Sequence, residues 1–114
     1  MYLVNGSWIE VGALLTPEQV GTILEETVLP SLEMLVRWGE EGRLHGGVFA
    51  GERETAFILV SDSAEEVGQL LASLPFWGMM RWQVRPLLSM RSALAREQAV
   101  LERLRSRRAA APDS

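Results

Sequence analysis

The run from Leu74 to Arg85 constrains the fold more than any other part of the sequence. Its beginning combines proline, glycine and aromatic residues and ends a helical pattern. Apolar and polar residues then alternate strictly, which places two sets on opposite faces of a strand: Met80, Trp82 and Val84 against Arg81, Gln83 and Arg85. We therefore predict a helix ending near Leu74, then an amphipathic strand over 80–85 that is the last strand of a sheet.

Three other segments, at 2–10, 44–50 and 55–60, have strand patterns, and the polar stretch 51–54 between the last two suits a hairpin. Helical patterns cover 16–42 and 63–74. Thr16 with Gln19, and Ser63 with Glu66, have the spacing of capping boxes at their starts. The order strand, helix, strand, strand, helix, strand predicts an α+β fold: a ferredoxin-like βαββαβ sandwich with a four-stranded antiparallel sheet and both helices on one face.

Residues 1–88 are expected to form this domain. A third, amphipathic helix over 89–108 extends it, with apolar side chains on one side at Met90, Leu94, Leu101 and Leu104. Residues 109–114 are expected to be a flexible tail. An arginine cluster near the end of this helix suits the negative end of the helix dipole and is more often a solvated terminus than a binding patch. This helix is also suited to embrace a neighbouring subunit, because its apolar side needs burial.

Composition excludes several functions. The 114 residues, 47% of them hydrophobic, suffice for one globular domain. A net charge of −4 argues against a nucleic-acid partner. The chain has no cysteine, no lysine and one histidine, so disulfides, Schiff-base chemistry and a zinc site are not expected, and no cofactor is predicted. The first residues lack the features of a signal peptide and no apolar run suits a membrane span, so we expect a cytoplasmic protein without a membrane partner.

The predicted sheet has two unlike faces. The face expected to pack on the helices is almost uniformly apolar, and it includes Ala56, Ile58 and Val60 of the third strand. The reverse face is mixed and is expected to carry these residues: Leu3, Asn5, Ser7, Ile9, His45, Gly47, Phe49, Thr55, Phe57, Leu59, Arg81, Gln83 and Arg85. Its large apolar side chains favour a cover, so we predict at least a homodimer in which two sheets enclose a lumen suited to a small ligand.

The chain resembles the muconolactone isomerase-like family of the dimeric α+β barrel superfamily over most of 16–89. Three features carry the resemblance: Glu40-Glu41-Gly42 at the end of the first helix, the two-strand hairpin, and Leu74-Pro75 followed by aromatic residues, Met80 and Val84. The resemblance implies a cofactor-free and metal-free isomerase of aromatic-compound catabolism. Such enzymes move a proton and a double bond within a small carboxylated lactone, in dimers assembled into larger rings.

The sequence departs from this family pattern at three places. Arg81 and Gln83 stand where the family tends to carry acidic residues, and the charged residues of the second strand are reduced to His45 beside Gly46-Gly47. The C-terminal helix extends beyond the usual end of the family. The resemblance therefore implies the same scaffold more strongly than the same substrate.

Two side chains of the mixed face are the main candidates for chemistry. His45 is the side chain best suited to exchange protons near neutral pH, and Gly46-Gly47 beside it would let a ligand come close, although a lone histidine is more often structural. Arg81 is suited to bind a substrate carboxylate in a bidentate manner; the alternative is an ion pair with Glu54 or with a partner subunit.

Other candidates have supporting roles. Asn5, Ser7 and Gln83 would orient the substrate, or satisfy one another and water, and Phe49 and Phe57 would line the lumen. Glu33 falls where the related isomerases carry a glutamate of the first helix, so the resemblance implies a catalytic base there. Its spacing from Arg37 favours instead an exposed ion pair across one helical turn.

The leading hypothesis is a proton-transfer isomerase with His45 as acid and base and Arg81 as the anion anchor. A second hypothesis is a non-catalytic module that senses a small ligand or forms oligomers through the same lumen. A third is a cofactor-independent oxygenase on the same barrel.

Overall fold

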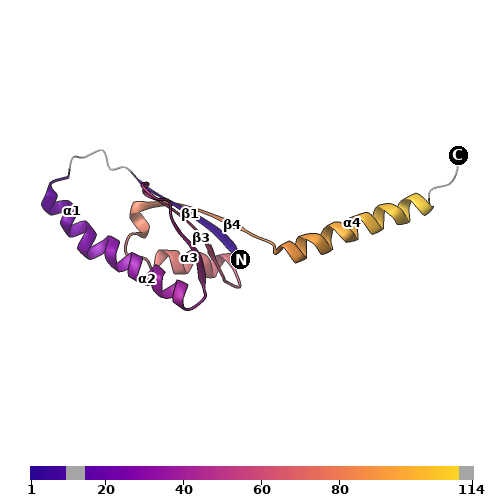
Figure 1. Ribbon diagram of the computed structural model, residues 1–114, viewed down its shortest axis with the longest axis horizontal. Helices are drawn as coiled ribbons and strands as arrows, with labels where there is room; N and C mark the ends of the chain where they lie inside the picture. The colour runs from indigo at the N-terminus through magenta and orange to yellow at the C-terminus, as the bar shows by residue number, and fades with distance from the viewer. Residues whose placement is uncertain (10–14, 111–114) are drawn as a thin grey trace.

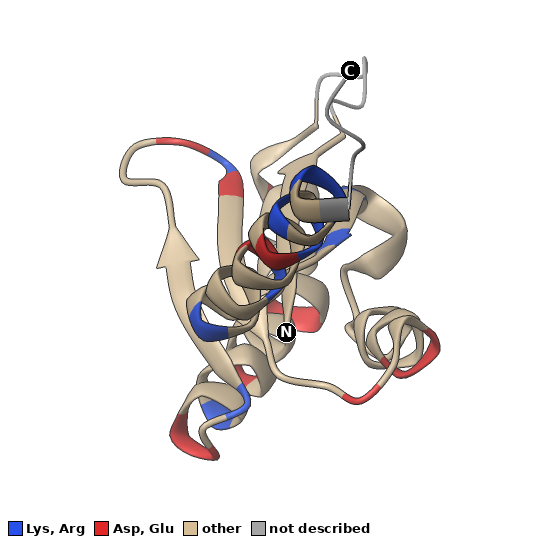
Figure 2. Cartoon of the chain, turned by 90° about the vertical axis from the view of Figure 1, so that its right-hand side faces the viewer, with Lys and Arg blue, Asp and Glu red and all other residues tan. Residues whose placement is uncertain are grey.

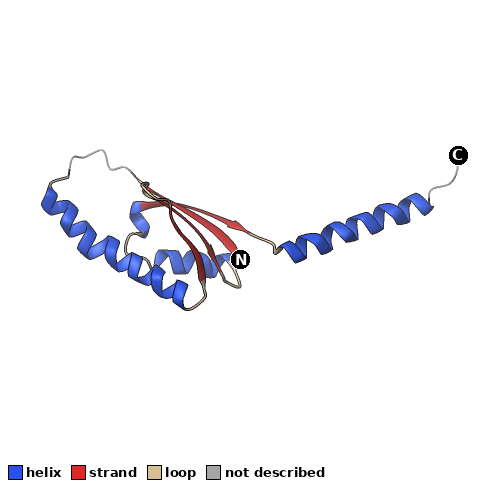
Figure 3. Ribbon diagram, viewed as in Figure 1, coloured by secondary structure: helices blue, strands red, loops and turns tan. Residues whose placement is uncertain are grey.

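The computed structural model describes residues 1–9 and 15–110. Four strands and four α-helices follow in the order β1 (Tyr2–Trp8), α1 (Pro17–Ile23), α2 (Leu29–Glu40), β2 (Leu44–Val48), β3 (Glu54–Leu59), α3 (Ala64–Ala72), β4 (Met80–Pro86) and α4 (Met90–Ala110). A π-helical turn, η1 (Leu24–Val28), joins α1 to α2, and a 3-10 turn, η2 (Trp77–Met79), precedes β4. Figure 3 shows the strands in one layer and the α1–α3 helices in another. The predicted βαββαβ order and α+β class are confirmed.

The sheet is antiparallel throughout, with the strand order β2-β3-β1-β4. The central strand β1 pairs Val4 with Phe57 on one side and with Val84 on the other. The helices α2 and α3 lie below the sheet in Figure 1 and leave its other face open. The core between sheet and helices contains Val4, Leu35, Trp38, Phe57, Leu59, Val67, Leu71, Leu74, Phe76 and Met80.

The first helical run begins as predicted and then changes its winding. The Thr16 hydroxyl accepts a hydrogen bond from the Gln19 amide (3.2 Å), and the Gln19 side chain accepts one from the Thr16 amide (2.9 Å), so the capping box is complete. The π turn η1 lies just before Pro30, which cannot donate a backbone hydrogen bond. The structure thus absorbs this proline by a local widening, and the helix continues through it.

The apolar side chains of this helix are only partly buried. Leu35 lies in the core, but Val20, Leu24 and Val36 are exposed and α1 contains no buried residue. In Figure 1 α1 extends past the end of the strands, so the sheet does not cover it. The exposed side chains form an unpartnered apolar surface on the outer side of the helix.

Ser31 links this helix to the start of β4. Its side chain is fully buried; the hydroxyl donates to the Thr27 carbonyl (2.7 Å) and accepts from the Phe76 amide (2.9 Å). The bond to Phe76 joins residues 45 positions apart. It therefore fixes the Pro/Gly/aromatic segment from which β4 departs.

The second capping box is half formed. The Ser63 hydroxyl accepts from the Glu66 amide at 3.1 Å, as predicted. The Glu66 carboxylate pairs with Arg43 at 3.4 Å instead of returning to Ser63. Within α3, Val67 and Leu71 are buried and belong to the core.

The predicted orientation of β3 is wrong. Phe57 (3% exposed), Leu59 and Thr55 face the helices, whereas Ala56 and Ile58 face the open side. Residues directly opposite each other in a sheet share a face, and the register places Phe57 opposite the fully buried Val4. This orientation buries the largest side chains of the strand, and the Phe57 ring packs edge-on against Trp82 with centroids 6.5 Å apart.

The helix α4 stands away from the domain. Figure 1 shows it projecting beyond the end of β4, away from α1. The radius of gyration of 21.3 Å reflects this extension, since a compact chain of this length would have one near 13 Å. The helix ends at Ala110, so residues 109 and 110 of the predicted tail are helical. Residues 111–114, like residue 10 at the end of the first predicted strand, lie outside the described residues.

None of the helices in the described ranges has the length and apolar character required to span a bilayer.

Candidate functional site

The open face of the sheet consists of cross-strand rows set by the register. One row runs Glu54, Ser7, Arg81 across β3, β1 and β4, and the next runs Gly47, Ala56, Asn5, Gln83. A third row runs His45, Ile58, Leu3, Arg85. Since adjacent strands are about 4.8 Å apart, the Glu54 and Arg81 backbones lie roughly 10 Å apart across β1.

The first two rows line a shallow hollow in this face. Its lining includes Asn5, Ser7, Phe49, Glu54, Arg81 and Gln83, together with the alternate residues Gly6, Thr55 and Trp82 of the same strands. Five of these, Asn5, Ser7, Phe49, Arg81 and Gln83, are residues that the sequence pattern proposes for ligand binding. The structure thus brings together most of the predicted polar site.

The two charged side chains of the hollow do not pair with each other. Arg81 and Glu54 face each other across Ser7, and neither belongs to an ion pair formed within the described part of the chain. The expected alternative, an Arg81–Glu54 salt bridge, is therefore not formed. An exposed guanidinium beside amide and hydroxyl groups is suited to hold a carboxylate by two parallel hydrogen bonds.

Glu54 is a site residue that the sequence interpretation missed. The sequence pattern places Glu54 in the hairpin turn, because the alternation of the third strand is predicted to begin at Thr55. In the structure β3 begins at Glu54, and the Phe49 amide bonds to the Glu54 carbonyl at 3.0 Å. Correct alternation from Ile58 through Ala56 to Glu54 is the sequence signal that would have placed this carboxylate on the open face.

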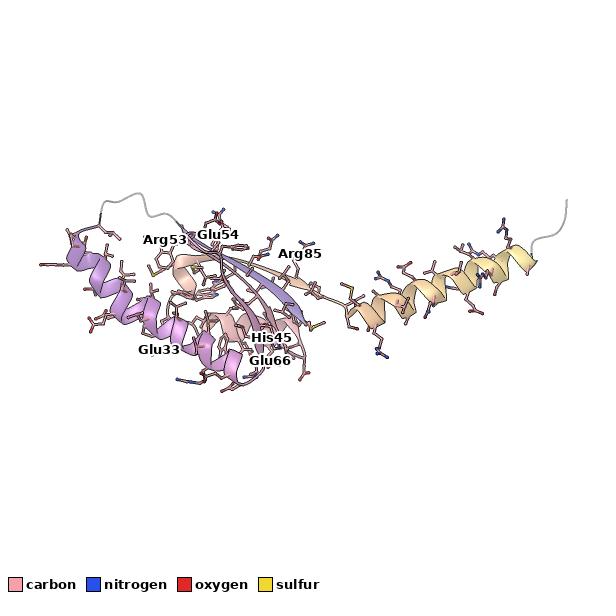
Figure 4. All side chains as sticks on the ribbon, in the orientation of Figure 1. Glu33, His45, Arg53, Glu54, Glu66 and Arg85 are labelled. Carbon is pink, nitrogen blue, oxygen red and sulfur yellow. The ribbon has the colours of Figure 1, made fainter. Side chains whose placement is uncertain are left out.

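His45 lies on the open face, as predicted, but outside the hollow. It is at the start of the edge strand β2, whereas Arg81 is on the edge strand β4 two rows away. Strand geometry puts the two backbones roughly 20 Å apart. Figure 4 shows His45 and Glu54 at opposite ends of the β2–β3 hairpin. Within one chain the two side chains His45 and Arg81 do not meet on one small substrate.

The neighbouring glycines have different environments. A side-chain carbon on Gly46 would lie 2.4 Å from the Ala56 carbonyl oxygen, and its φ of 145° is one that favours glycine. Gly46 thus allows close contact with β3, which differs from the expected contact with a ligand. Gly47 has open space beside it.

Two further predicted site residues are not in the hollow. Phe57 belongs to the core on the opposite face of the sheet, so it does not line an open-face ligand site. Glu33 is exposed on α2 within the helical layer, where Figure 4 labels it away from the strands. Its expected ion pair with Arg37 is also not formed among the described residues.

No group of three or more histidine, aspartate or glutamate side chains within 1–9 and 15–110 is arranged to hold a metal ion. Among the described lining residues, the polar side chains on the open face are one guanidinium (Arg81), one carboxylate (Glu54), two amides (Asn5 and Gln83) and one hydroxyl (Ser7).

The fold and the hollow define an α+β sandwich with a polar site on the uncovered face of its sheet. Comparison with solved structures finds the same fold in the crystal structure of muconolactone isomerase. The two chains superpose with a TM-score of 0.60 at 20% sequence identity, over 77% of this chain and 88% of that one. This chain therefore has a muconolactone isomerase-like fold. No protein-family model and no curated protein sequence matches it.

Proposed function

We propose that this protein binds a small carboxylated molecule in the hollow and isomerises it by proton transfer without a cofactor. The observation that carries the proposal is Arg81, an exposed guanidinium without an ion-pair partner in the described chain, in one row with Ser7 and Glu54. The structural likeness to muconolactone isomerase supports a carboxylated lactone as the substrate class.

A second copy is proposed to close the site. The open face carries the half-buried apolar residues Leu3, Ala56 and Ile58 beside the hollow, and α4 does not cover them. Two such faces packed against each other would bury this patch and exclude water from the hollow, which strengthens the attraction between Arg81 and a carboxylate. We therefore propose a homodimer with the ligand between the sheets.

Glu54 is the proposed base. Its carboxylate would take a proton from a carbon next to the lactone carbonyl and return it to another carbon, so that the double bond moves and no atom is gained or lost. Arg81 holds the substrate carboxylate, and Asn5, Ser7 and Gln83 donate hydrogen bonds to the oxygen that gains negative charge. His45 is not used, because it lies outside the hollow.

The test is the rate of muconolactone isomerisation by the purified protein and its variants. Glu54→Gln keeps the shape but removes the base, and we expect kcat to fall by a factor of about 100 or more. Glu52→Gln is the matched control, since Glu52 is an exposed residue of the same hairpin outside the hollow, and His45→Gln should likewise retain activity. A rate that depends on His45 and not on Glu54 would contradict this assignment.

A non-catalytic ligand-binding role is the second candidate. The chain has a single histidine, and that residue is remote from the hollow. Among the described residues that line the hollow, Glu54 is then the only proton acceptor of ordinary strength. Binding of the lactone without any turnover, abolished by Arg81→Gln, would favour this second function.

A further inference from the structure

The helix α4 exposes an apolar stripe that no part of the described chain covers. Met90, Leu94, Leu101 and Leu104 recur at spacings of three, four and seven residues, so they lie along one side of the helix. All four are exposed, from 48% for Leu101 to 89% for Met90. Such a continuous stripe marks a surface that packs against something else.

Charge is divided unequally between α4 and the rest of the chain. Residues 1–89 contain twelve acidic residues and five arginines, a formal charge of −7, whereas 90–110 contain six arginines and two glutamates, a charge of +4. Figure 2 shows the arginines along α4 and the acidic residues spread over the domain. The charge of α4 thus favours an acidic partner surface and opposes pairing of two α4 helices.

The outer side of the run Pro17–Glu40 has the complementary properties. Val20, Leu24, Leu29 and Val36 are exposed there, up to 60% for Val36. Glu33 and Glu40 follow Leu29 and Val36 by four residues, so these carboxylates flank the apolar side chains one turn further along. The run is about 36 Å long and α4 about 31 Å, so one helix can lie along the other for nearly its whole length.

The topology prevents this contact within one chain. The strands β2 and β4 are opposite edges of the sheet, α2 packs beside β2, and α4 follows β4. Only residues 87–89 connect β4 to α4. The Leu87 amide donates a hydrogen bond to the Met1 carbonyl (2.8 Å), which fixes the start of this connection. Three residues span about 10 Å, which is too short to carry α4 around the sheet to its own α2.

The open face is a poorer partner for α4, because the described rows of that face carry Arg81 and Arg85 against the one carboxylate of Glu54. We propose that α4 of one copy packs along the outer side of α1–η1–α2 of a second copy, with its arginines opposite the glutamates of that surface. This contact is separate from the open face, so it does not depend on the proposed ligand.

Reciprocal charge exchange in the full chain tests the proposal. The first variant, Arg91→Glu with Arg105→Glu, reverses two arginines next to the apolar stripe. The second, Glu33→Arg with Glu40→Arg, reverses two charges on the outer side of α1–η1–α2, the surface proposed to receive α4. Sedimentation should show that each variant alone self-associates at least about tenfold more weakly than the unaltered protein, and that a mixture of the two regains association.

The matched control is Arg96→Glu with Arg103→Glu, which makes the same charge change on the opposite side of α4. It should weaken association much less than the first variant. Circular dichroism checks that every variant is folded, which is expected because α4 is outside the core and Glu33 and Glu40 are exposed on α2.

Three results would overturn the proposal. One is a variant with the Arg91 and Arg105 reversals that self-associates as strongly as the unaltered protein in sedimentation. Another is a mixture that associates no better than its two components. The third is binding of α4 to vesicles containing anionic phosphatidylglycerol, lost with the same reversals while self-association persists, which would assign the basic helix to a membrane surface.

Discussion

Replacing Ser31 with alanine tests how the helical layer positions β4. The Ser31 hydroxyl is fully buried and satisfies both the Phe76 amide and the Thr27 carbonyl. Alanine leaves the buried Phe76 N–H without this partner, which costs about 1–3 kcal/mol. Taking the middle of that range, we expect the free energy of unfolding to fall by about 2 kcal/mol and Tm by roughly 8–15 °C.

Urea unfolding followed by circular dichroism measures this loss. Ser73→Ala is the matched control, because the Ser73 hydroxyl also donates to a carbonyl, that of Leu70, but is exposed to water. Its cost should stay below about 0.5 kcal/mol. If the two alanine variants lose equal stability, the buried bond does not hold the Pro/Gly/aromatic segment and the reasoning is refuted.

Three further substitutions probe the sheet by the same unfolding measurement. Thr55→Val should raise stability by about 1 kcal/mol, because the buried Thr55 hydroxyl has no hydrogen-bond partner among the described residues; a loss would mean that it has one. Gly46→Ala should destabilise by about 2 kcal/mol or more, because its new methyl group meets the β3 backbone, while Gly47→Ala should cost less than 1. Phe57→Ala should cost about 3–5 kcal/mol and Phe49→Ala, which is 49% exposed, less than about 1; equal costs would contradict the orientation of β3.

Much of the fold was predictable because strong local signals agree with the tertiary structure. The Thr16 capping box, the Ser63 N-cap and the alternation from Met80 all correspond to observed features. The orientation of β3 was not predictable from its own residues, since both faces of Thr55–Val60 are largely apolar. Pairing with β1 decides it, because opposing residues must share a face and Val4 faces the helices.

The wrong orientation predicted for β3 also explains which site residues the sequence identifies and which it misses. Arg81, Gln83, Asn5 and Ser7 belong to strands with clear alternation, so their meeting in one hollow follows from the sequence. Glu54 was missed and Phe57 was misplaced because β3 was shifted by one residue. The distance between His45 and Arg81 depends on the strand order, which local patterns do not contain.

The central claim is that Arg81 binds the carboxylate of a small ligand on the open face. Calorimetric titration of the protein with muconolactone tests it most directly, using Arg81→Gln and the matched control Arg85→Gln. Arg85 is on the same strand and the same face but outside the hollow. We predict that Arg81→Gln weakens binding by a factor of about 10 or more, as expected for loss of a charge-assisted pair of hydrogen bonds, and that Arg85→Gln changes it less than about twofold. Equal affinity in both variants, or a loss confined to Arg85→Gln, would contradict the account.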